Sequence, residues 1–260
     1  MGAKLENGVV ISNDQIAKDI YSMFIKAPNI ANSVEMPGQF INLYPKEKHT
    51  ILPRPISICE VDSKEETIRV VYQVVGDGTG QFAKLKREDE IQVSGPIGNG
   101  FDISGDHREH LLVGGGVGVP PLLELSKRLK GNVTVVLGFR DEPYLIEDFE
   151  KYGAKVYVAT ESGKHGSKGN VLDILKQEDI KIDMAYSCGP KPMLKALNSW
   201  CQEKDIPVQV SLEERMACGI GVCVGCVCKK KDSGNKDGWS YKKTCTDGPV
   251  FMGSDVIWDE

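Results

Sequence analysis

The sequence predicts a multidomain protein of the β plus α/β class: an N-terminal antiparallel β-barrel, a central parallel-sheet domain and a small C-terminal segment. Three observations support this. Up to about residue 100, short β-rich runs are separated by turn residues. From His110 onward, strand and helix patterns alternate four times. From Glu213 onward the chain is rich in Gly and Cys. We therefore expect domains at residues 1–103, 104–212 and 213–260.

The composition argues against several classes of function. The chain has 260 residues, 27% of them charged and a net charge of −5, with lysines and carboxylates interspersed. This mixture leaves no basic face of the kind that binds nucleic acid. No apolar run approaches the roughly 18 residues needed to cross a bilayer, and the N-terminal residues lack the apolar core of a signal peptide. We expect a soluble, cytoplasmic protein.

The expected barrel strands include the β-rich runs GQFINLYP, RPISICEV, ETIRVVYQVVG and DEIQVSGPIG. The expected strand and helix pairs of the central domain are HLLVGGG with PPLLELSKRLK, NVTVVLGF with LIEDFEKYG, KVYVATESG with NVLDILKQE, and KIDMAYSCGP with KPMLKALNSWCQEK. A last strand follows in PVQVS. The four histidines show no spacing typical of metal ligands or of a catalytic triad, and we expect all four on surface loops.

The strongest motif is a cysteine cluster near the C-terminus. Cys218, Cys223 and Cys226 follow the spacing C-x4-C-x2-C, and Cys245 lies downstream. This spacing is typical of the plant-type [2Fe–2S] cluster, whose two irons take four thiolates. Zinc is the alternative, although structural zinc sites more often show two short cysteine hooks and only one is present here. Cys228 lies two residues after Cys226, and on a strand it would point away, so Cys245 is the better fourth ligand.

Two stretches carry residues suited to a bound phosphate and an aromatic ring. In the run Arg54-Pro55-Ile56-Ser57, the Arg can hold a phosphate and the Ser hydroxyl can bond a ring nitrogen. Gly78 and Thr79 open a short segment of helical character, where backbone N–H groups could cradle a pyrophosphate. Each signal has a plainer interpretation, as a strand edge or as an ordinary turn.

A glycine-rich loop follows the first strand of the central domain. It contains Gly114, Gly115, Gly116 and Gly118, and two prolines follow at positions 120 and 121. Proline is favoured in a first helical turn, and the exposed N–H groups before it favour an anion. The fingerprint G-x-G-x-x-G is not satisfied, because a proline stands where its last glycine should fall.

The order of these motifs resembles that of the ferredoxin-reductase family. RPIS, YQVVGDGT, GPIGNGF, GGGVGVPP and CGPKPM occur in that family's order over almost the whole chain. The resemblance implies FAD on the barrel and NAD on the central domain. The FAD-binding residues it implies are Arg54, Pro55, Ile56, Ser57, Val71, Tyr72, Gln73, Gly78 and Thr79. The NAD-binding residues it implies are Gly114, Gly115, Gly116, Gly118, Cys188, Gly189 and Pro190.

Two residues qualify this resemblance. Plant-type members carry an aromatic residue between the Arg and the Ser, where it stacks on the flavin, and Ile56 stands there instead. Cys188 is expected to line the nicotinamide site and to pack there. We expect no nucleophilic role for it, since no His is near it in the sequence and hydride transfer needs no nucleophile.

The C-terminal motifs LEERMACGIGVCVGCVC and TCTDGPVF are similar to those of the electron-transfer subunits of dihydroorotate dehydrogenase B. This resemblance implies a hetero-oligomer with an FMN-containing dihydroorotate dehydrogenase subunit, whose electrons cross the cluster and FAD to NAD. The three predicted domains leave no residues for the (β/α)₈ barrel that would bind dihydroorotate. Alternatives are a subunit of a sulfhydrogenase or of an NADH-dependent ferredoxin:NADP oxidoreductase, and a redox sensor or zinc-stapled binding module.

The end of the third central strand favours NAD over NADP. Glu161 follows that strand, where its carboxylate would repel a 2′-phosphate and could accept a hydrogen bond from a ribose hydroxyl. Arg140, after the second strand, is the residue that could reverse this preference.

Overall fold

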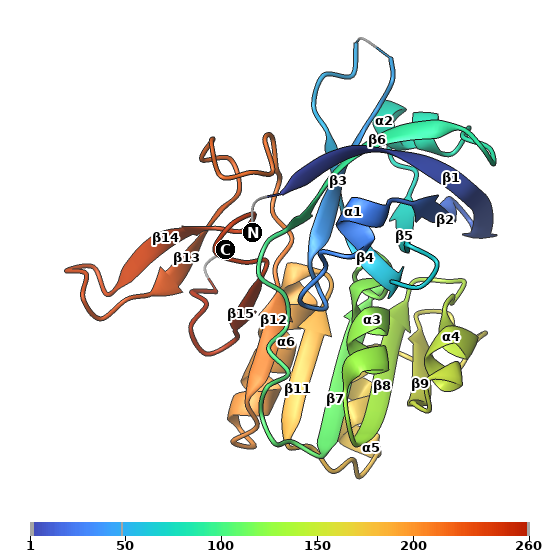
Figure 1. Cartoon of the computed structure of the whole chain (residues 1–260). Coiled ribbons are helices and arrows are strands. Elements are labelled where there is room, and N and C mark those ends of the chain that lie inside the picture. The colour runs from blue at the N-terminus through green and yellow to red at the C-terminus, as the bar shows by residue number, and fades with distance from the viewer. Residues whose placement is uncertain (1–2, 48, 259–260) are drawn as a thin grey trace.

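The computed structural model describes residues 3–47 and 49–258. Its N-terminal part is a closed antiparallel barrel with the strand order β1-β2-β5-β4-β3-β6 (Figure 1). The barrel strands are β1 (Lys4–Ala17), β2 (Ile20–Lys26), β3 (Phe40–Tyr44), β4 (Arg54–Asp62), β5 (Thr67–Gln73) and β6 (Glu90–Ile97). Two short helices, α1 (Pro28–Ala31) and α2 (Asp77–Phe82), accompany them.

Strand β5 shows how the barrel meets its neighbour. Ile68, Val70 and Tyr72 alternate along it and belong to the barrel core. Val71 points the other way and packs in a second core that includes α3 and α4 of the central domain. Because side chains of a strand alternate between its two faces, one strand serves both the barrel and the contact between domains.

The central part is a seven-stranded sheet with the order β10-β9-β8-β7-β11-β12-β15. Its strands are β7 (Glu109–Gly115), β8 (Asn132–Phe139), β9 (Lys155–Thr160), β10 (Ser167–Lys168), β11 (Met184–Cys188), β12 (Val208–Ser211) and β15 (Val250–Met252). The first six are parallel, and β15 is antiparallel to β12. A 3₁₀ turn, η1 (Gly116–Gly118), follows β7. This architecture confirms the predicted fold class.

Helices cover both faces of the central sheet. The helices are α3 (Pro121–Arg128), α4 (Ile146–Lys151), α5 (Val171–Gln177) and α6 (Lys191–Gln202). Leu112 of β7 packs with α3 and α4, whereas its neighbours Leu111 and Val113 pack with α5 and α6. A parallel sheet buried on both faces needs such continuous apolar strands, which explains the unbroken run HLLV.

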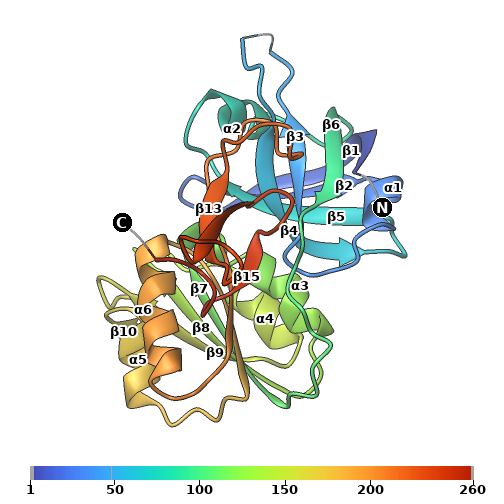
Figure 2. The same ribbon diagram turned by 90° about the vertical axis from the view of Figure 1, so that its left-hand side faces the viewer.

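The C-terminal segment lies on one side of the junction between the two larger parts, as Figures 1 and 2 together show. It contains a hairpin of β13 (Val227–Lys231) and β14 (Trp239–Lys243), and then β15, which pairs with β12 of the central sheet. Phe251 of β15 enters the core beneath α6. The predicted boundary at residue 213 stays a prediction, although the last strand of the segment completes the sheet of its neighbour.

Charged residues join the barrel to the central domain. Arg69 of β5 pairs with Asp148 of α4 at 2.6 Å and with Glu60 at 3.7 Å. Glu124 of α3, with a side chain only 3% exposed, accepts a hydrogen bond from the backbone N–H of Val61 at 2.9 Å. Buried carboxylates require such partners, so these contacts bind the two domains in one orientation.

Two sequence-based expectations change in detail. Helix α2 begins at Asp77, so Gly78 and Thr79 lie within its first turn and not before it. His110 was expected on a surface loop, but it lies in β7 and is 4% exposed, where its ring bonds the carbonyl of Lys130. Its place in an apolar strand run, HLLV, explains the difference. Among the described residues, no helix is long and apolar enough to cross a membrane.

Candidate functional site: a pocket beside a cysteine loop

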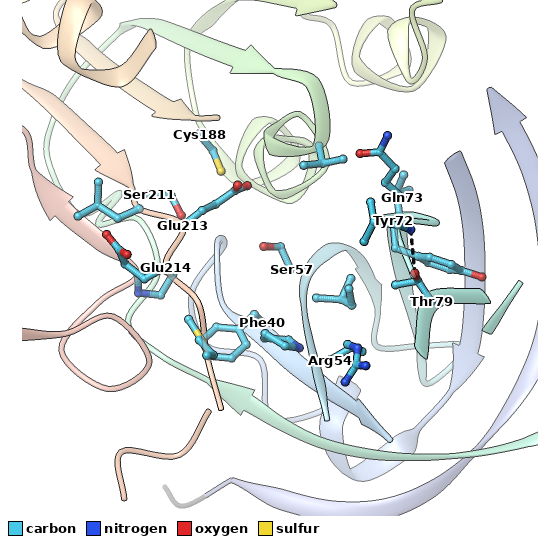
Figure 3. Close-up of a pocket in the computed structure, with 18 residues that line it drawn as sticks. Phe40, Arg54, Ser57, Tyr72, Gln73, Thr79, Cys188, Ser211, Glu213 and Glu214 are labelled. Atoms are coloured by element: carbon cyan, nitrogen blue, oxygen red, sulfur yellow. Dashed lines mark hydrogen bonds between the residues drawn. The ribbon is translucent and has the colours of Figure 1, made fainter. Parts of the chain in front are cut away.

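A cavity of about 350 Å³ lies where the barrel, the central sheet and the C-terminal segment meet (Figure 3). Nine of the predicted cofactor-binding residues line it: Arg54, Pro55, Ile56, Ser57, Val71, Tyr72, Gln73, Thr79 and Cys188. Cofactor pockets of this kind are apolar clefts between domains with a few convergent polar groups. The cavity therefore brings together residues from three separate stretches of the sequence.

The barrel wall of the pocket comes from the adjacent strands β4 and β5. Ser57 faces the cavity in Figure 3, with Ile56 beside it in the wall. The hydroxyl of Tyr72 is already engaged, because it donates to Asn13 Oδ1 at 3.0 Å, and burial raises its pKa. The phenol is thus a fixed, neutral part of the barrel, and Ser57 is the free hydroxyl of this wall.

The phosphate-binding residues predicted from two separate motifs lie together. A side chain added at Gly78 would come within 2.5 Å of Arg54 Nε, so the guanidinium lies directly on the first turn of α2. The Thr79 hydroxyl accepts from the backbone N–H of Val75 at 3.0 Å and donates to the Gly76 carbonyl at 3.1 Å. A phosphate at this corner would meet both a fixed cation and backbone donors, which suits the pyrophosphate of FAD.

The glycine loop lies against the turn that contains Cys188. Strands β7 and β11 are neighbours, with Gly114 opposite Cys188. A side chain at Gly118 would come within 2.4 Å of the Cys188 carbonyl oxygen, and one at Gly115 within 2.7 Å of Met193 Sδ. Glycine is required at Gly118, because the atoms that a side chain would meet there belong to the backbone. The carboxyl ends of adjacent parallel strands are where open α/β sheets bind nucleotides.

Cys188 is placed as expected for a residue that packs in the site. It is 2% exposed, and burial raises the pKa of its thiol, with the nearby Glu213 carboxylate acting in the same direction. A thiol held neutral in this way is a poor nucleophile. The prediction that Cys188 lines the site without nucleophilic chemistry thus has a physical basis.

Glu213 is a pocket residue that the sequence analysis did not identify. Its carboxyl points into the cavity from the side of Cys188 (Figure 3). The pocket walls desolvate this carboxyl and raise its pKa, although water still reaches it through the open mouth. Other lining residues missed from the sequence are Phe40, Val75, Val117, Ser211, Leu212, Glu214, Met216 and Pro249. Several of them lie within the motifs quoted above, but nothing in those motifs indicates that they line this cavity, and only the tertiary structure brings them here.

The cysteine loop presents backbone donors to its own sulfur atoms. The N–H of Cys223 lies 3.3 Å from Cys218 Sγ. Desolvation would raise the pKa of the Cys218 thiol, but the N–H groups of Cys223, Ile220 and Val222 prevail and lower it to about 6. Thiolates bind iron, and N–H bonds to their sulfurs accompany iron–sulfur sites. These donors make the loop suited to a cluster.

The fourth predicted ligand lies at the inner side of this loop. Cys245 and Cys226 are buried against each other, in contact with Phe40 and Ile97 of the barrel. Cys228 instead packs with the core of the central domain. Within the described ranges, no group of three His, Cys, Asp or Glu residues is arranged to hold one metal ion. The ligand set Cys218, Cys223, Cys226 and Cys245 stays a prediction.

Phe40 and Met216 connect the two sites. Both line the cavity, and both pack with Cys226 and Cys245. The cavity and the cysteine loop are therefore separated by single side chains.

The residues predicted to select between NAD and NADP lie side by side. Phe139 of β8 pairs with Thr160 of β9, so Arg140 and Glu161 both leave the sheet at the same edge. Both are exposed, at the carboxyl ends of their strands. The structure thus places a carboxylate and a guanidinium at the edge where the 2′ position of a nucleotide would lie.

Comparison with known proteins gives a consistent result. Residues 213–257 match the model of the iron-sulfur cluster binding domain of dihydroorotate dehydrogenase B. The chain is similar to the dihydroorotate dehydrogenase B (NAD(+)) electron transfer subunits of Fusobacterium nucleatum (45% identity, covering 97% of this chain and 98% of the relative) and of Caldanaerobacter subterraneus (42% identity, 96% and 97%). A structure of an NADH-dependent reduced ferredoxin-NADP oxidoreductase is also similar (TM-score 0.86, 31% identity, 97% and 90%).

Proposed function

The chain belongs to the family of dihydroorotate dehydrogenase B electron transfer subunits, and from this premise we propose that it passes electrons from a partner's FMN to NAD. The route runs through a [2Fe–2S] cluster and an FAD, both of which the family and the fold support. The observation that carries the proposal is the contact of Phe40 and Met216 with both the cavity and the buried cysteines. A cluster and a flavin bound here would be separated by little more than one side chain.

FAD fits the cavity and its phosphate corner. Arg54, Gly78 and Thr79 would hold the pyrophosphate, and Ser57 with the backbone of β5 would hold the ring. Ile56 would offer the ring an aliphatic contact where plant-type reductases use an aromatic one. The flavin supplies the ability to take up electrons one at a time and to release them in pairs, which neither an iron–sulfur cluster nor NAD provides.

The residues around the cavity would position the nicotinamide and exclude water from it. The close approach of Gly118 to the Cys188 carbonyl holds the glycine loop against the cavity wall, where the nicotinamide would lie. Cys188, kept as a neutral thiol, excludes water from that side without reacting. Tyr144 donates to the carbonyl of Gly116 at 2.6 Å and thereby orients the glycine loop. Gly114, Gly115, Gly116, Gly118, Gly189 and Pro190 would then contact the NAD.

The cysteine loop fits a [2Fe–2S] cluster by the chemistry of its donors. Four thiolates are available from Cys218, Cys223, Cys226 and Cys245, and the first already accepts backbone N–H bonds. Gly219, at φ +66°, lies against the amide of Asn42, where any side chain would collide. The loop can therefore curl tightly beside the barrel.

The outer face of the cysteine loop is the surface we expect the catalytic subunit to cover. Ile220, Val222 and Val224 are 52%, 80% and 72% exposed. Three neighbouring aliphatic side chains in water indicate an interface. Their place between the thiolates means that a partner docked on them would lie directly beside the cluster. The eight thiols are unpaired, as the reducing cytosol keeps them, and we expect the complex in the cytoplasm.

Co-expression with the catalytic subunit tests this function. We expect a complex that survives gel filtration and reduces NAD with dihydroorotate, while neither subunit alone does so. The purified chain should show flavin and iron–sulfur absorbance and should reduce a dye with NADH. Dihydroorotate oxidation by the isolated chain, or separate elution with no gain of activity on mixing, would contradict the proposal.

A second candidate is a subunit of an NADH-dependent ferredoxin:NADP oxidoreductase. The similar solved structure at a TM-score of 0.86 favours it, but its 31% identity is below that of the dihydroorotate dehydrogenase B relatives. Affinity capture from native cells followed by mass spectrometry separates the two. A dihydroorotate dehydrogenase subunit should be recovered under the first function, and a different partner under the second.

A further inference from the structure

Lys243, the last residue of β14, lies beneath the cysteine loop. Its Nζ donates to the carbonyl oxygen of Gly221 at 2.6 Å, in a partly buried position. Gly221 lies between Cys218 and Cys223, so this bond joins a lysine from the hairpin to the middle of the predicted ligand loop. Neither the family motif nor the cysteine spacing assigns a role to this lysine.

The contact places a cation on the backbone between two predicted ligands. The Lys243 ammonium bonds a carbonyl oxygen three residues after Cys218 and two residues before Cys223. The Cys218 sulfur faces the same stretch of backbone, since the N–H of Cys223 donates to it at 3.3 Å. A positive charge held here acts on the thiolates at short range, because a partly buried charge is screened less than one at the surface.

Several contacts hold the lysine and the loop in place. Lys243 pairs with Val227 across the hairpin, and its own N–H donates to Asp247 Oδ2 at 2.7 Å. The Lys243 carbonyl accepts from the N–H of Asp247 at 2.8 Å. Gly221 has φ +82°, and a side chain there would come within 2.7 Å of Thr246. The ammonium is thus directed at one carbonyl by the turn that follows β14.

We propose that Lys243 stabilises the reduced form of the [2Fe–2S] cluster by holding a positive charge at the Gly221 carbonyl, in the middle of the ligand loop. The inference rests on the proposed function, because it needs a cluster on the cysteine loop. Reduction adds one negative charge to the cluster and its thiolates. Nearby charge is a determinant of iron–sulfur potentials. A cation held against the loop makes the reduced state more favourable.

Redox titration of the anaerobic protein, followed by electron paramagnetic resonance of the reduced cluster, tests the proposal. In Lys243→Met the midpoint potential should become more negative. At the wild-type midpoint, the ratio of reduced to oxidised cluster should fall roughly tenfold, the effect of one charge acting at a partly buried site. Lys243→Arg, which keeps the cation and a donor, should retain the wild-type potential.

Lys242→Met is the matched control. Lys242 precedes Lys243 in β14 and lines a different cavity on the other face of the hairpin. The variant makes the same change in net charge at the neighbouring residue of the strand, and we expect less than a third of the shift. An equal shift in Lys242→Met would overturn the proposal, since it would show a general charge effect and no role for the peptide contact.

Iron and sulfide analysis separates a failure of the role proposed for Lys243 from a failure of the proposed function. If Lys243→Met loses its iron, Lys243→Gln decides, because its amide keeps a donor to Gly221 without the charge. A wild-type potential in Lys243→Gln, or in Lys243→Met with its iron retained, would overturn the proposal. A wild-type chain that binds no iron at all would instead contradict the proposed function.

Discussion

The cysteine loop and the flavin cavity are neighbours, but the chain builds them in opposite ways. Three of the four predicted ligands, Cys218, Cys223 and Cys226, fall within nine consecutive residues, and the loop's own backbone faces its sulfurs. The cavity walls run from Phe40 to Pro249 and include both domains and the C-terminal segment. One site is encoded by local spacing, and the other exists only when distant segments are packed together.

This difference affects what holds each site together. The cysteine loop depends on short contacts such as the N–H of Cys223 to Cys218 Sγ and on Lys243. The cavity depends on the orientation of the barrel relative to the central sheet, which Glu124 and the Arg69–Asp148 pair maintain. Changes at the first set should therefore act on the cluster alone, and changes at the second should act on the whole fold.

The largest expected effect concerns the cysteines. Replacing Cys218, Cys223, Cys226 or Cys245 by Ser should remove the cluster, so that iron falls from about two per chain to nearly none. Cys228→Ser is the control and should keep its iron, because Cys228 packs with the central domain. Iron analysis and the visible spectrum measure this. Iron loss on changing Cys228 but not Cys245 would reverse the ligand assignment. It would also show that spacing along the chain does not identify the fourth ligand.

The next largest effect is expected at the contact between the barrel and the central domain. Glu124→Leu removes the acceptor of the Val61 N–H and leaves the Arg128 guanidinium, which lies 2.6 Å from Glu124, without its partner. We expect a loss of about 3 kcal/mol in the free energy of unfolding, as for other broken buried ion pairs. Urea unfolding of the purified protein measures it.

The exposed residue Glu150 of α4 provides the control for that experiment. Glu150→Leu should change the free energy of unfolding by less than about 0.5 kcal/mol. Flavin retention should fall in Glu124→Leu while iron retention changes less. Equal stability of the two variants would mean that the domain contact does not support the cavity.

A smaller effect is expected at the outer edge of the central sheet. Wild type should prefer NADH to NADPH in kcat/KM for dye reduction, because Glu161 would repel a 2′-phosphate. Glu161→Ser should reduce this preference roughly tenfold. Arg140→Gln should leave the preference for NADH unchanged, because Arg140 is not expected to bind a 2′-phosphate. A wild-type enzyme that uses both nucleotides equally would refute the prediction.

The smallest effect concerns Glu213 and pH. Since the pocket raises the pKa of this carboxyl, the folded protein binds more protons than the unfolded chain above about pH 4.3, the usual value for Glu. Stability must then fall as the pH rises from there through the raised folded pKa.

Glu213→Gln should remove this fall in stability with rising pH, because the amide does not titrate. The variant should equal wild type below about pH 4 and exceed it at neutral pH by less than about 1 kcal/mol, since water still reaches the carboxyl. Thermal unfolding between acid and neutral pH measures the difference. A parallel pH dependence of the two proteins would show that the pocket does not desolvate the carboxyl in solution.

Several features could be predicted from the sequence because their signals are local. The alternation of strand and helix from His110 predicted the parallel sheet, and turn residues between β-rich runs predicted the barrel. The order of motifs also pointed to half of the residues that line the cavity, between Arg54 and Thr79 and at Cys188. In each case a short stretch determines its own conformation or its own chemistry.

Other features depended on contacts between distant residues. No local pattern marks Glu213 or Phe40 as a pocket residue, and nothing in the hairpin sequence directs Lys243 toward Gly221. The sequence also gives no signal that β15 joins the central sheet. A strand of three residues is stable only through its pairing with β12.

Helix and strand periodicity and cysteine spacing act over a few residues, so the main alternation of strands and helices and a cysteine loop spaced for a cluster follow from the sequence. The contact of Phe40 and Met216 with both the cluster loop and the flavin cavity depends on tertiary packing. The C-terminal segment contacts both domains, because β15 pairs with β12 of the central sheet while Cys226 and Cys245 bury apolar surface against Phe40 and Ile97 of the barrel.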